Sequence, residues 1–302
     1  MKETFPISKG QETPTFSKRE IEFLDNEVQT MKKGALIEDD FRGKEFSDEF
    51  VDQCKKEVEK IKEGFEKDNK ISEMKSEIEE NFALSKEYRQ ASEYLEALFY
   101  NKLGGRDGWI PNALVWKTSE YDDYVNGIDF VVESEDRELA LGTDVTFSHS
   151  RALVSKLNRI KKQIDTGELP QLTFYDPVKM TDRPLPRAVI AVEREKIIKA
   201  LKLWADSEHN EGFEHLLRNH PLRAKTMLEL EMQLESFAVY AKNIGRREIA
   251  SSYNDLLSQI QLLIIDHEET IKNYRELIDD DLAYQTIASF CESLKNTKNF
   301  EN

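Results

Sequence analysis

The spacing of apolar positions predicts helices toward both ends of the chain and strands in its middle. Apolar residues recur at steps of three and four over 47–82, over 83–103 and through most of 207–302, which is the period of an amphipathic helix. Between these parts, short runs rich in β-branched and aromatic residues alternate with turn signals and two further helical patterns. The predicted strands are WIPNALVWKTS (109–119), IDFVVES (128–134), ELALGTDVTFS (138–148), QLTFYDPV (171–178) and PRAVIAV (186–192), and the helices among them are 151–164 and 193–205.

This order of elements divides the chain into four regions. Residues 83–206 read α-β-β-β-α-β-β-α, which predicts a mixed central sheet flanked by helices, a fold of the α/β or α+β class. Residues 1–46 hold few apolar anchors besides a short helical stretch, and we expect a poorly ordered or loosely docked lead-in. Residues 47–82 predict a charged helical arm, and residues 207–302 an α-helical hairpin with one further helix. The apolar stripe of this last region suits core packing, a homodimer contact or a protein partner.

Composition narrows the class of protein. No run of about 18 apolar residues occurs, and the first ten residues lack the basic start and apolar stretch of a signal peptide, so we expect no membrane association and a cytoplasmic location. Cys54 and Cys291 have no CxxC partner and no nearby histidine cluster, and we expect ordinary thiols. A formal net charge of -16 excludes a protein that coats nucleic acid by bulk charge.

Two aspartates occupy positions where a plain core would have apolar residues. Asp129 and Asp144 each lie in a predicted strand that is otherwise apolar, although Asp is disfavoured in strands and an unpaired buried carboxylate is costly. Because a short turn joins the two strands, the carboxylates either converge at one end of the sheet or face solvent on an edge strand. Convergent carboxylates raise each other's pKa unless a cation neutralises them, and their hard oxygen atoms suit Mg²⁺ or Mn²⁺.

Basic side chains on the next predicted helix lie close to these acids in sequence. Lys156 is at the edge of the buried stripe of 151–164, where it either reaches the acids or extends to solvent. Residues 145–204 hold 12 basic and 6 acidic side chains, a net charge of +6, so an acidic chain can still present a local basic face. The nearest candidates for contacts with a phosphate backbone are Arg151, Arg159, Lys161 and Lys162.

The segments GIDFVVE and GTDVTFS on consecutive strands, within the order α-β-β-β-α-β, resemble the core of the PD-(D/E)xK nuclease superfamily. The resemblance covers residues 83–206 and implies the restriction-endonuclease-like fold, with Asp129 and Asp144 as acids that bind one or two divalent metal ions. The lysine of the (D/E)xK motif would come two residues after the second acid, where this chain has Thr146. Some members of the superfamily carry that lysine on the following helix, and Lys156 is the best-placed substitute.

The resemblance also implies functional residues on the two neighbouring helices. An acid is often supplied by the helix before the strands, and Glu96 is favoured over Glu93 because it lies about 80° rather than about 140° from the centre of the apolar stripe. On the helix after the strands, Gln163 resembles a glutamine that several branches carry, and we expect it to contact substrate. The implied catalytic residues are Asp129, Asp144, Lys156 and Glu96.

One more acid completes the expected metal site. Asp123, ahead of Asp122 and Glu120, lies in the loop before the first acidic strand and is an expected ligand. Together these residues predict a Mg²⁺- or Mn²⁺-dependent nuclease, and its expected partner is nucleic acid, DNA in preference to RNA, bound through the local basic face. The alternative is a catalytically inactive nuclease-like scaffold that binds a protein through its acidic helical regions, which Thr146 and the net charge favour.

Overall fold

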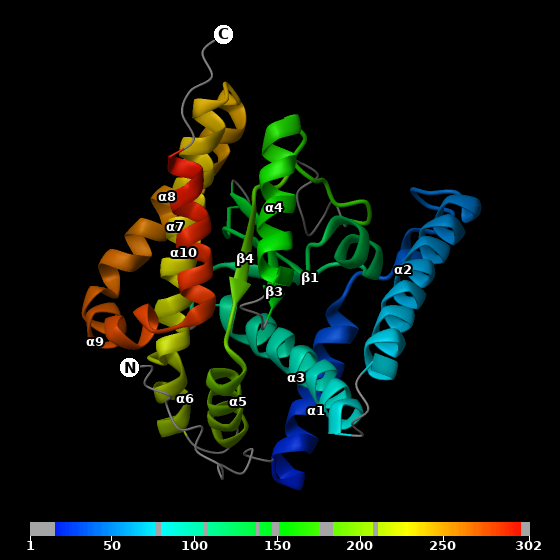
Figure 1. The fold of residues 1–302 in the computed structure, drawn as a ribbon, viewed down its shortest axis with the longest axis horizontal. Coiled ribbons are helices and arrows are strands. Elements are labelled where there is room, and N and C mark those ends of the chain that lie inside the picture. Colours follow the sequence, from blue (N-terminus) through cyan, green and yellow to red (C-terminus); the bar gives the residue numbers. More distant parts are fainter. Residues whose placement is uncertain are drawn as a thin grey trace.

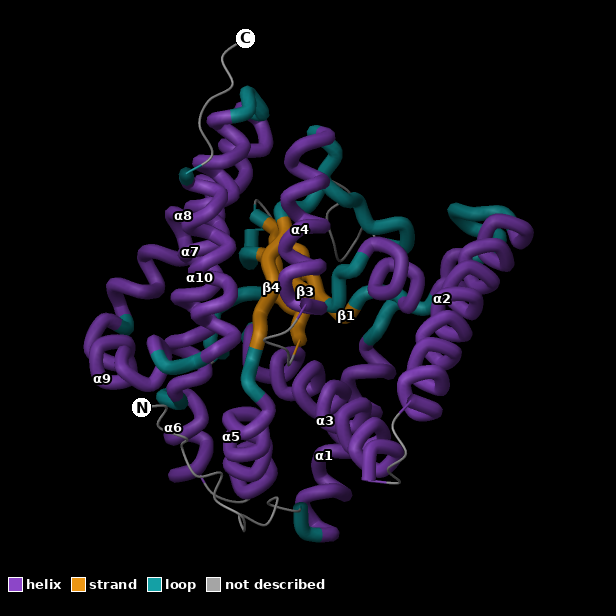
Figure 2. The backbone as a smooth tube through the Cα atoms, in the orientation of Figure 1, coloured by secondary structure: helices purple, strands orange, loops and turns teal. Residues whose placement is uncertain are grey.

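A four-stranded mixed sheet lies at the centre of the protein. The computed structural model describes residues 16–75, 80–105, 108–136, 139–146, 151–175, 184–207 and 211–296. The first three strands form an antiparallel meander, and the fourth lies parallel to the third after a helical crossover. Figure 2 shows the strands enclosed by helices. In the order of the sheet they are β1 (Leu114–Lys117), β2 (Phe130–Glu133), β3 (Ala140–Thr146) and β4 (Arg187–Ala191).

The helices surround this sheet on several sides (Figure 1). One group, α1, α3 and α5, packs together below the sheet in this view, and α4 covers β4. The C-terminal helices α7, α8 and α10 lie on the left, and α2 forms the right-hand edge. Their bounds are α1 (Lys18–Gly34), α2 (Asp48–Lys75), α3 (Glu80–Leu103), α4 (Arg151–Thr166), α5 (Arg194–Ser207), α6 (Glu211–Arg218), α7 (Pro221–Asn243), α8 (Arg247–Asp266), α9 (Glu268–Asp279) and α10 (Leu282–Lys295), with a 3-10 turn at Glu38–Phe41 and a π-helical turn at Asp122–Asn126.

The prediction of a mixed sheet flanked by helices is confirmed, but one predicted strand is wrong. Residues 171–175, the described part of QLTFYDPV, form no strand. Instead, the amides of Thr173 and Phe174 donate to the Asp122 carboxylate at 2.7 and 3.0 Å. Because a side chain uses the hydrogen-bonding groups that a strand would offer to a neighbour, this apolar segment stays irregular.

The expectation of a poorly ordered lead-in does not hold for residues 18–46; residues 1–15 lie outside the described part of the chain. Helix α1 begins with a capping box between Ser17 and Glu20. Its buried side chains, at steps of four and three residues, join the main core beside α3 and α5. These three are Leu24, Val28 and Met31.

Helix α2 is attached to the body through its N-terminal half and is not a fully solvated arm. Val51, Cys54 and Val58 are buried, and the first two form a small apolar cluster with Phe41 and Phe174. The helix also contacts the π-helical turn in the segment between β1 and β2. Among the described helices, none combines the length and apolar composition needed to cross a bilayer.

Helices α7, α8 and α10 contribute to the main hydrophobic core together with the sheet, and α9 packs against α7 in a second cluster. Where the pattern predicted a hairpin and one further helix, residues 211–296 form α6 to α10, and α8 and α9 are separate helices that meet at His267. Helix α7 covers the outer edge of β4 with polar side chains, a role that its sequence did not suggest. Gln233 accepts from the Val189 amide at 2.9 Å and donates to the Val189 carbonyl at 2.7 Å.

Two more side chains of α7, Glu229 and Lys225, bind the next outward-facing backbone groups of β4, at Ala191. Glu229 accepts from the Ala191 amide at 3.3 Å, and Lys225, which lies 2.7 Å from Glu229, donates to the Ala191 carbonyl. Burial raises the pKa of the Glu229 carboxyl to about 7. Side chains of a helix thus take the place of a fifth strand, which satisfies a buried sheet edge.

Gln233→Met should destabilise the protein by about 2 to 5 kcal/mol, because it leaves a buried amide and a buried carbonyl of Val189 without partners. Urea unfolding followed by circular dichroism measures this loss. The matched control is Gln261→Met, at an exposed position on α8, which should change stability by less than about 0.5 kcal/mol. Equal stabilities of the two variants would contradict the edge-capping role.

Candidate functional site

The two aspartates that the sequence singled out, here called the facing pair, come from adjacent parts of the sheet: Asp129 immediately precedes β2, and Asp144 lies on β3. Phe130 on β2 pairs with Thr143 on β3, and the Asp129 amide donates to the Thr143 carbonyl at 2.9 Å. The Asp129 side chain reaches β3 beside Asp144, because its Oδ2 accepts a hydrogen bond from the amide of the next residue, Val145. Like charges this close repel each other. Both residues are buried, so the convergent arrangement holds and the solvent-facing alternative is wrong.

Different partners hold the two carboxylates. Asp129 Oδ2 accepts a hydrogen bond from the Val145 amide at 2.7 Å. Asp144 forms an ion pair with Lys156 through Oδ1, and its Oδ2 lies 3.7 Å from Arg187 Nη2. Burial and the neighbouring charge of Asp129 raise the pKa of Asp144 to about 6, although both cations oppose this shift. The pair is therefore electrostatically strained in the absence of a further cation.

Lys156 reaches the acids from α4, which is one of the two alternatives that its place at the edge of the apolar stripe left open. The helix packs against β4 through Leu157 and Ile160 in the main core, and this places the ammonium on Asp144. Burial lowers the pKa of Lys156, but the carboxylates of Asp144 and Asp129 outweigh it and raise the pKa overall. The lysine therefore carries a full positive charge beside the facing pair.

A further lysine, which is buried and which the sequence did not single out, links two more acids to the site. Lys117 ends β1, and its Nζ lies 3.2 Å from Glu96 Oε2 and 2.9 Å from Asp123 Oδ2. The acids Asp123, Glu96 and Asp129 hold the pKa of Lys117 above its ordinary value despite burial. The signal that marked the aspartates was also present here, because Lys117 follows the apolar residues of β1 directly.

The structure separates the acids that the sequence left as alternatives. Glu96 contacts Lys117, whereas Glu93, on the same helix, forms an ion pair with Lys32 at 3.1 Å and is partly exposed. Burial is the main cause that raises the pKa of Glu96 to about 7, and the charge of Asp129 adds to it. Of the two candidate glutamates on α3, only Glu96 belongs to this cluster.

In the segment before β2, neighbouring acids have different surroundings. Asp123 points to Lys117, and burial together with Asp129 raises its pKa well above the ordinary value. Asp122 accepts four hydrogen bonds of 2.7 to 3.0 Å, from Ser119, Asn126 and the amides of Thr173 and Phe174. Asp122 thus fixes the loop. Glu120 forms an exposed ion pair with Lys62.

The five residues expected to contact substrate are distributed over α4. Arg151, Arg159 and Lys162 are exposed, and Arg159 also donates to the carbonyl of Val125. Lys161 lies 2.7 Å from Asp165 and over the Tyr240 ring, where it contacts the C-terminal helices. Gln163 accepts from Arg187 at 3.3 Å and so reaches Asp144 only through that arginine. Lys161 and Gln163 therefore have intramolecular partners in this structure.

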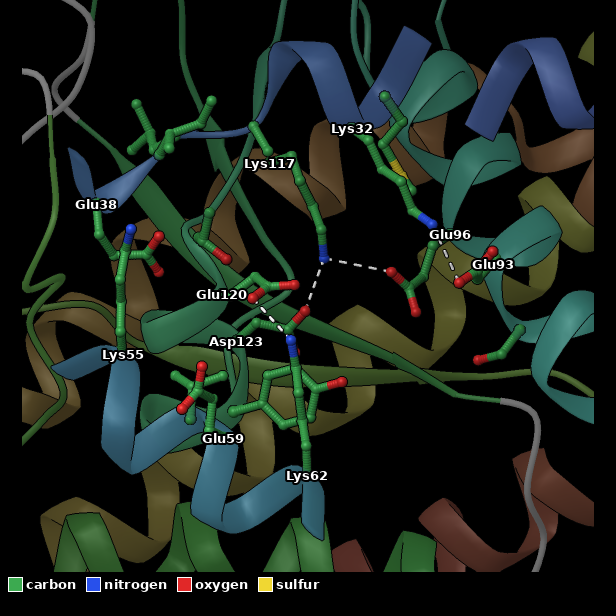
Figure 3. A pocket seen from close by; sticks show the side chains of 18 residues that line it. Lys32, Glu38, Lys55, Glu59, Lys62, Glu93, Glu96, Lys117, Glu120 and Asp123 are labelled. Atoms are coloured by element: carbon green, nitrogen blue, oxygen red, sulfur yellow. Dashed lines mark hydrogen bonds and ion pairs between the residues drawn. The ribbon is translucent and has the colours of Figure 1, made fainter. Parts of the chain in front are cut away.

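A cavity of about 1020 Å³ opens onto one side of the acidic cluster (Figure 3). It lies between α1, α2 and α3 and the 117–124 segment, and Glu96, Lys117 and Asp123 form part of its lining. Four lysines and six acidic residues line it, so the cavity has no excess of positive charge. Its lining residues are Met31, Lys32, Ala35, Leu36, Ile37, Glu38, Lys55, Val58, Glu59, Lys62, Ser92, Glu93, Glu96, Lys117, Thr118, Glu120, Asp123 and Tyr124.

The acidic side chains of the site are of the type that binds a divalent cation. Glu96, Asp123, Asp129 and Asp144 offer the hard carboxylate oxygens that Mg²⁺ and Mn²⁺ prefer, and their mutual repulsion favours an added positive charge. Within the described residues, no three acidic, histidine or cysteine side chains already stand in a metal-binding arrangement. The facing pair Asp129 and Asp144 are the residues that would hold an ion, and the ion would compete with Lys156 for Asp144.

Neighbouring acids 122 and 123 should respond in opposite ways to substitution. Asp122→Ala should lower stability by about 2 to 4 kcal/mol, because four hydrogen-bond donors lose their acceptor. Asp123→Asn should raise stability by about 1 kcal/mol, because it removes repulsion with Asp129 and leaves Glu96 to hold Lys117. Urea unfolding in a chelating buffer measures both. A loss of similar size in both variants would refute the division into a structural and a functional acid.

Comparisons of the chain with family models, with curated proteins and with solved structures gave no match. What the site does must therefore be inferred from its own geometry and chemistry.

Proposed function

We propose that this protein is a divalent-metal-dependent nuclease that hydrolyses phosphodiester bonds in nucleic acid, DNA in preference to RNA. The observation that carries the proposal is the facing pair Asp129 and Asp144, buried side by side, with Lys156 on the second acid. The order of α3, three antiparallel strands, α4 and a parallel β4 supports the restriction-endonuclease-like fold that the sequence resembles. In this arrangement α3 contributes Glu96 and α4 contributes Lys156.

Each residue has a distinct part in the proposed reaction. Asp129 and Asp144 would hold Mg²⁺ or Mn²⁺, and Asp123 and Glu96 stand beside them as further carboxylates. A bound divalent ion would lower the pKa of its water ligand and shield the charge that grows on the phosphate. Lys156, released from Asp144, would turn its ammonium toward that phosphate and stabilise the same charge.

The nucleic acid would lie along the exposed face of α4. Arg151, Arg159 and Lys162 project from this helix into solvent, and their charges suit phosphate contacts. Arg159 also holds the loop before β2 through Val125, so a phosphate contact there would be coupled to the position of Asp129. Because the chain carries a net charge of -16, binding through this face should be modest and sensitive to salt.

A second candidate function is a binding scaffold without catalysis. Thr146 replaces the motif lysine at the end of β3, and Lys117 and Lys156 already occupy three of the four carboxylates. An acidic partner-binding protein with a nuclease-like core would show the same features. The two candidates differ in metal dependence, because the scaffold needs no divalent ion.

Asp144→Asn should reduce cleavage of a labelled oligonucleotide with Mn²⁺ by about 100-fold or more, and Lys156→Met by about 10- to 100-fold. Single-stranded DNA, duplex DNA and RNA are tested in parallel, with and without EDTA. The controls are Asp255→Asn on α8 and Lys272→Met on α9, both at exposed positions, which should cleave as the natural protein does. Cleavage by Asp144→Asn at the natural rate, or no metal-dependent cleavage by the natural protein, would refute the nuclease and favour the scaffold.

Lys162→Ala should weaken nucleic-acid binding about equally for all sequences and lower the slope of log affinity against log salt by about one. Fluorescence anisotropy at several salt concentrations measures this, with Asp144→Asn as the background to prevent cleavage. Lys272→Ala in the same background is the matched control, since it removes an exposed lysine from another helix. Identical salt slopes for the two variants would exclude α4 as the binding face.

A further inference from the structure

Lys117 occupies a position where a strand of this kind would be expected to bury an apolar side chain. It is the last residue of β1 and is buried, and its ammonium lies over the Phe130 ring at 5.0 Å. Burying a lysine removes its hydration, and replacing a buried ion pair by apolar residues is often neutral or stabilising. Stability alone therefore gives no reason for a lysine here.

The two acids that hold Lys117 come from elements that are far apart in sequence. Glu96 projects from α3 and Asp123 from the π-helical turn, and both contact one ammonium, at 3.2 and 2.9 Å (Figure 3). A divalent ion links carboxylates from separate elements in the same way. The ammonium of Lys117 thus stands where a metal ion bound by Glu96 and Asp123 would stand.

We infer that Lys117 is a built-in cation of this site, which takes the place of a second divalent ion, so that the site binds one metal ion, at Asp129 and Asp144. This inference rests on the proposed nuclease function and assigns the site its metal count. Lys117 supplies the positive charge that a second ion would otherwise bring. Glu96 and Asp123 then form ion pairs with the lysine and do not bind a metal ion.

The position of Lys117 in the cavity agrees with this role. The other lysines of the lining pair with acids outside the central cluster: Lys32 with Glu93, Lys62 with Glu120 and Lys55 with Asp39. Lys117 instead pairs with Glu96 and Asp123, two acids of the lining on which the charge of Asp129 also acts. Among the four lysines of the lining, Lys117 is therefore the one whose ion pairs join the cavity to the acidic cluster.

The test is the number of Mn²⁺ ions that the full chain binds, measured by calorimetry and by electron paramagnetic resonance. The natural protein should bind one ion and give the spectrum of an isolated Mn²⁺. Lys117→Met should bind two ions, because Glu96 and Asp123 lose their cation and become free to hold a metal. Lys62→Met, which removes another lysine of the same cavity, is the matched control and should still bind one.

The outcomes separate this inference from the function on which it rests. Two ions on the natural protein would overturn the role of Lys117 and leave the nuclease proposal standing. One ion on Lys117→Met, in a folded protein, would also overturn it. No ion on the natural protein would overturn the nuclease proposal and this inference with it. If Lys117→Met does not fold, the spectrum of the natural protein still decides, because two neighbouring Mn²⁺ ions give a coupled signal and one does not.

Discussion

Repulsion among buried carboxylates is the constraint that organises this protein. Asp129, just before β2, lies beside Asp144 of β3, and α3 and the π-helical turn add Glu96 and Asp123 to the same cluster. Such a cluster can be buried only where cations from other elements form ion pairs with it and offset the repulsion. Lys117 from β1, Lys156 from α4 and Arg187 from β4 do so, and each strand other than β2 and β3 thereby brings one charge to the site.

The C-terminal helices belong to this arrangement because they hold β4. Arg187 has no exposed surface; its backbone amide and carbonyl bond to the Tyr253 hydroxyl of α8, and its side chain reaches Asp144, Gln163 and the carbonyl of Gly127. Gly127 has a φ of +67°, and a Cβ atom there would lie 3.0 Å from Arg187 Nη2 and closer still to Arg159. Tyr253, 66 residues away in sequence, thus holds the backbone of the arginine whose side chain contacts Asp144.

The sequence predicted the parts of the site that break a local rule. Asp129 and Asp144 were identifiable because an acid in an apolar segment is unusual. The helical period favoured Glu96 over Glu93 and put Lys156 at the edge of an apolar stripe, from which it could reach either the acids or solvent. Lys117 breaks the same rule, yet the polar residues that follow it resemble an exposed strand end. Contacts that depend on tertiary packing could not be predicted from the sequence pattern. Gln233 bonds to a β4 residue 44 positions away, and the spacing of apolar residues in α7 indicates only which face of the helix is apolar.

For the proposed nuclease, the charge balance imposes an order on binding. At the site itself, the carboxylates of Glu96, Asp123, Asp129 and Asp144 outnumber the cations of Lys117, Lys156 and Arg187. A phosphate group that reaches the site from the face of α4 therefore meets net negative charge. A divalent ion meets the opposite field, since the repulsion that raises the pKa of Asp144 is relieved when a cation arrives. Metal would therefore bind before nucleic acid, and the metal-bound site would then attract the phosphate. The acidity that excludes a bulk nucleic-acid coat is thus compatible with catalysis at one point.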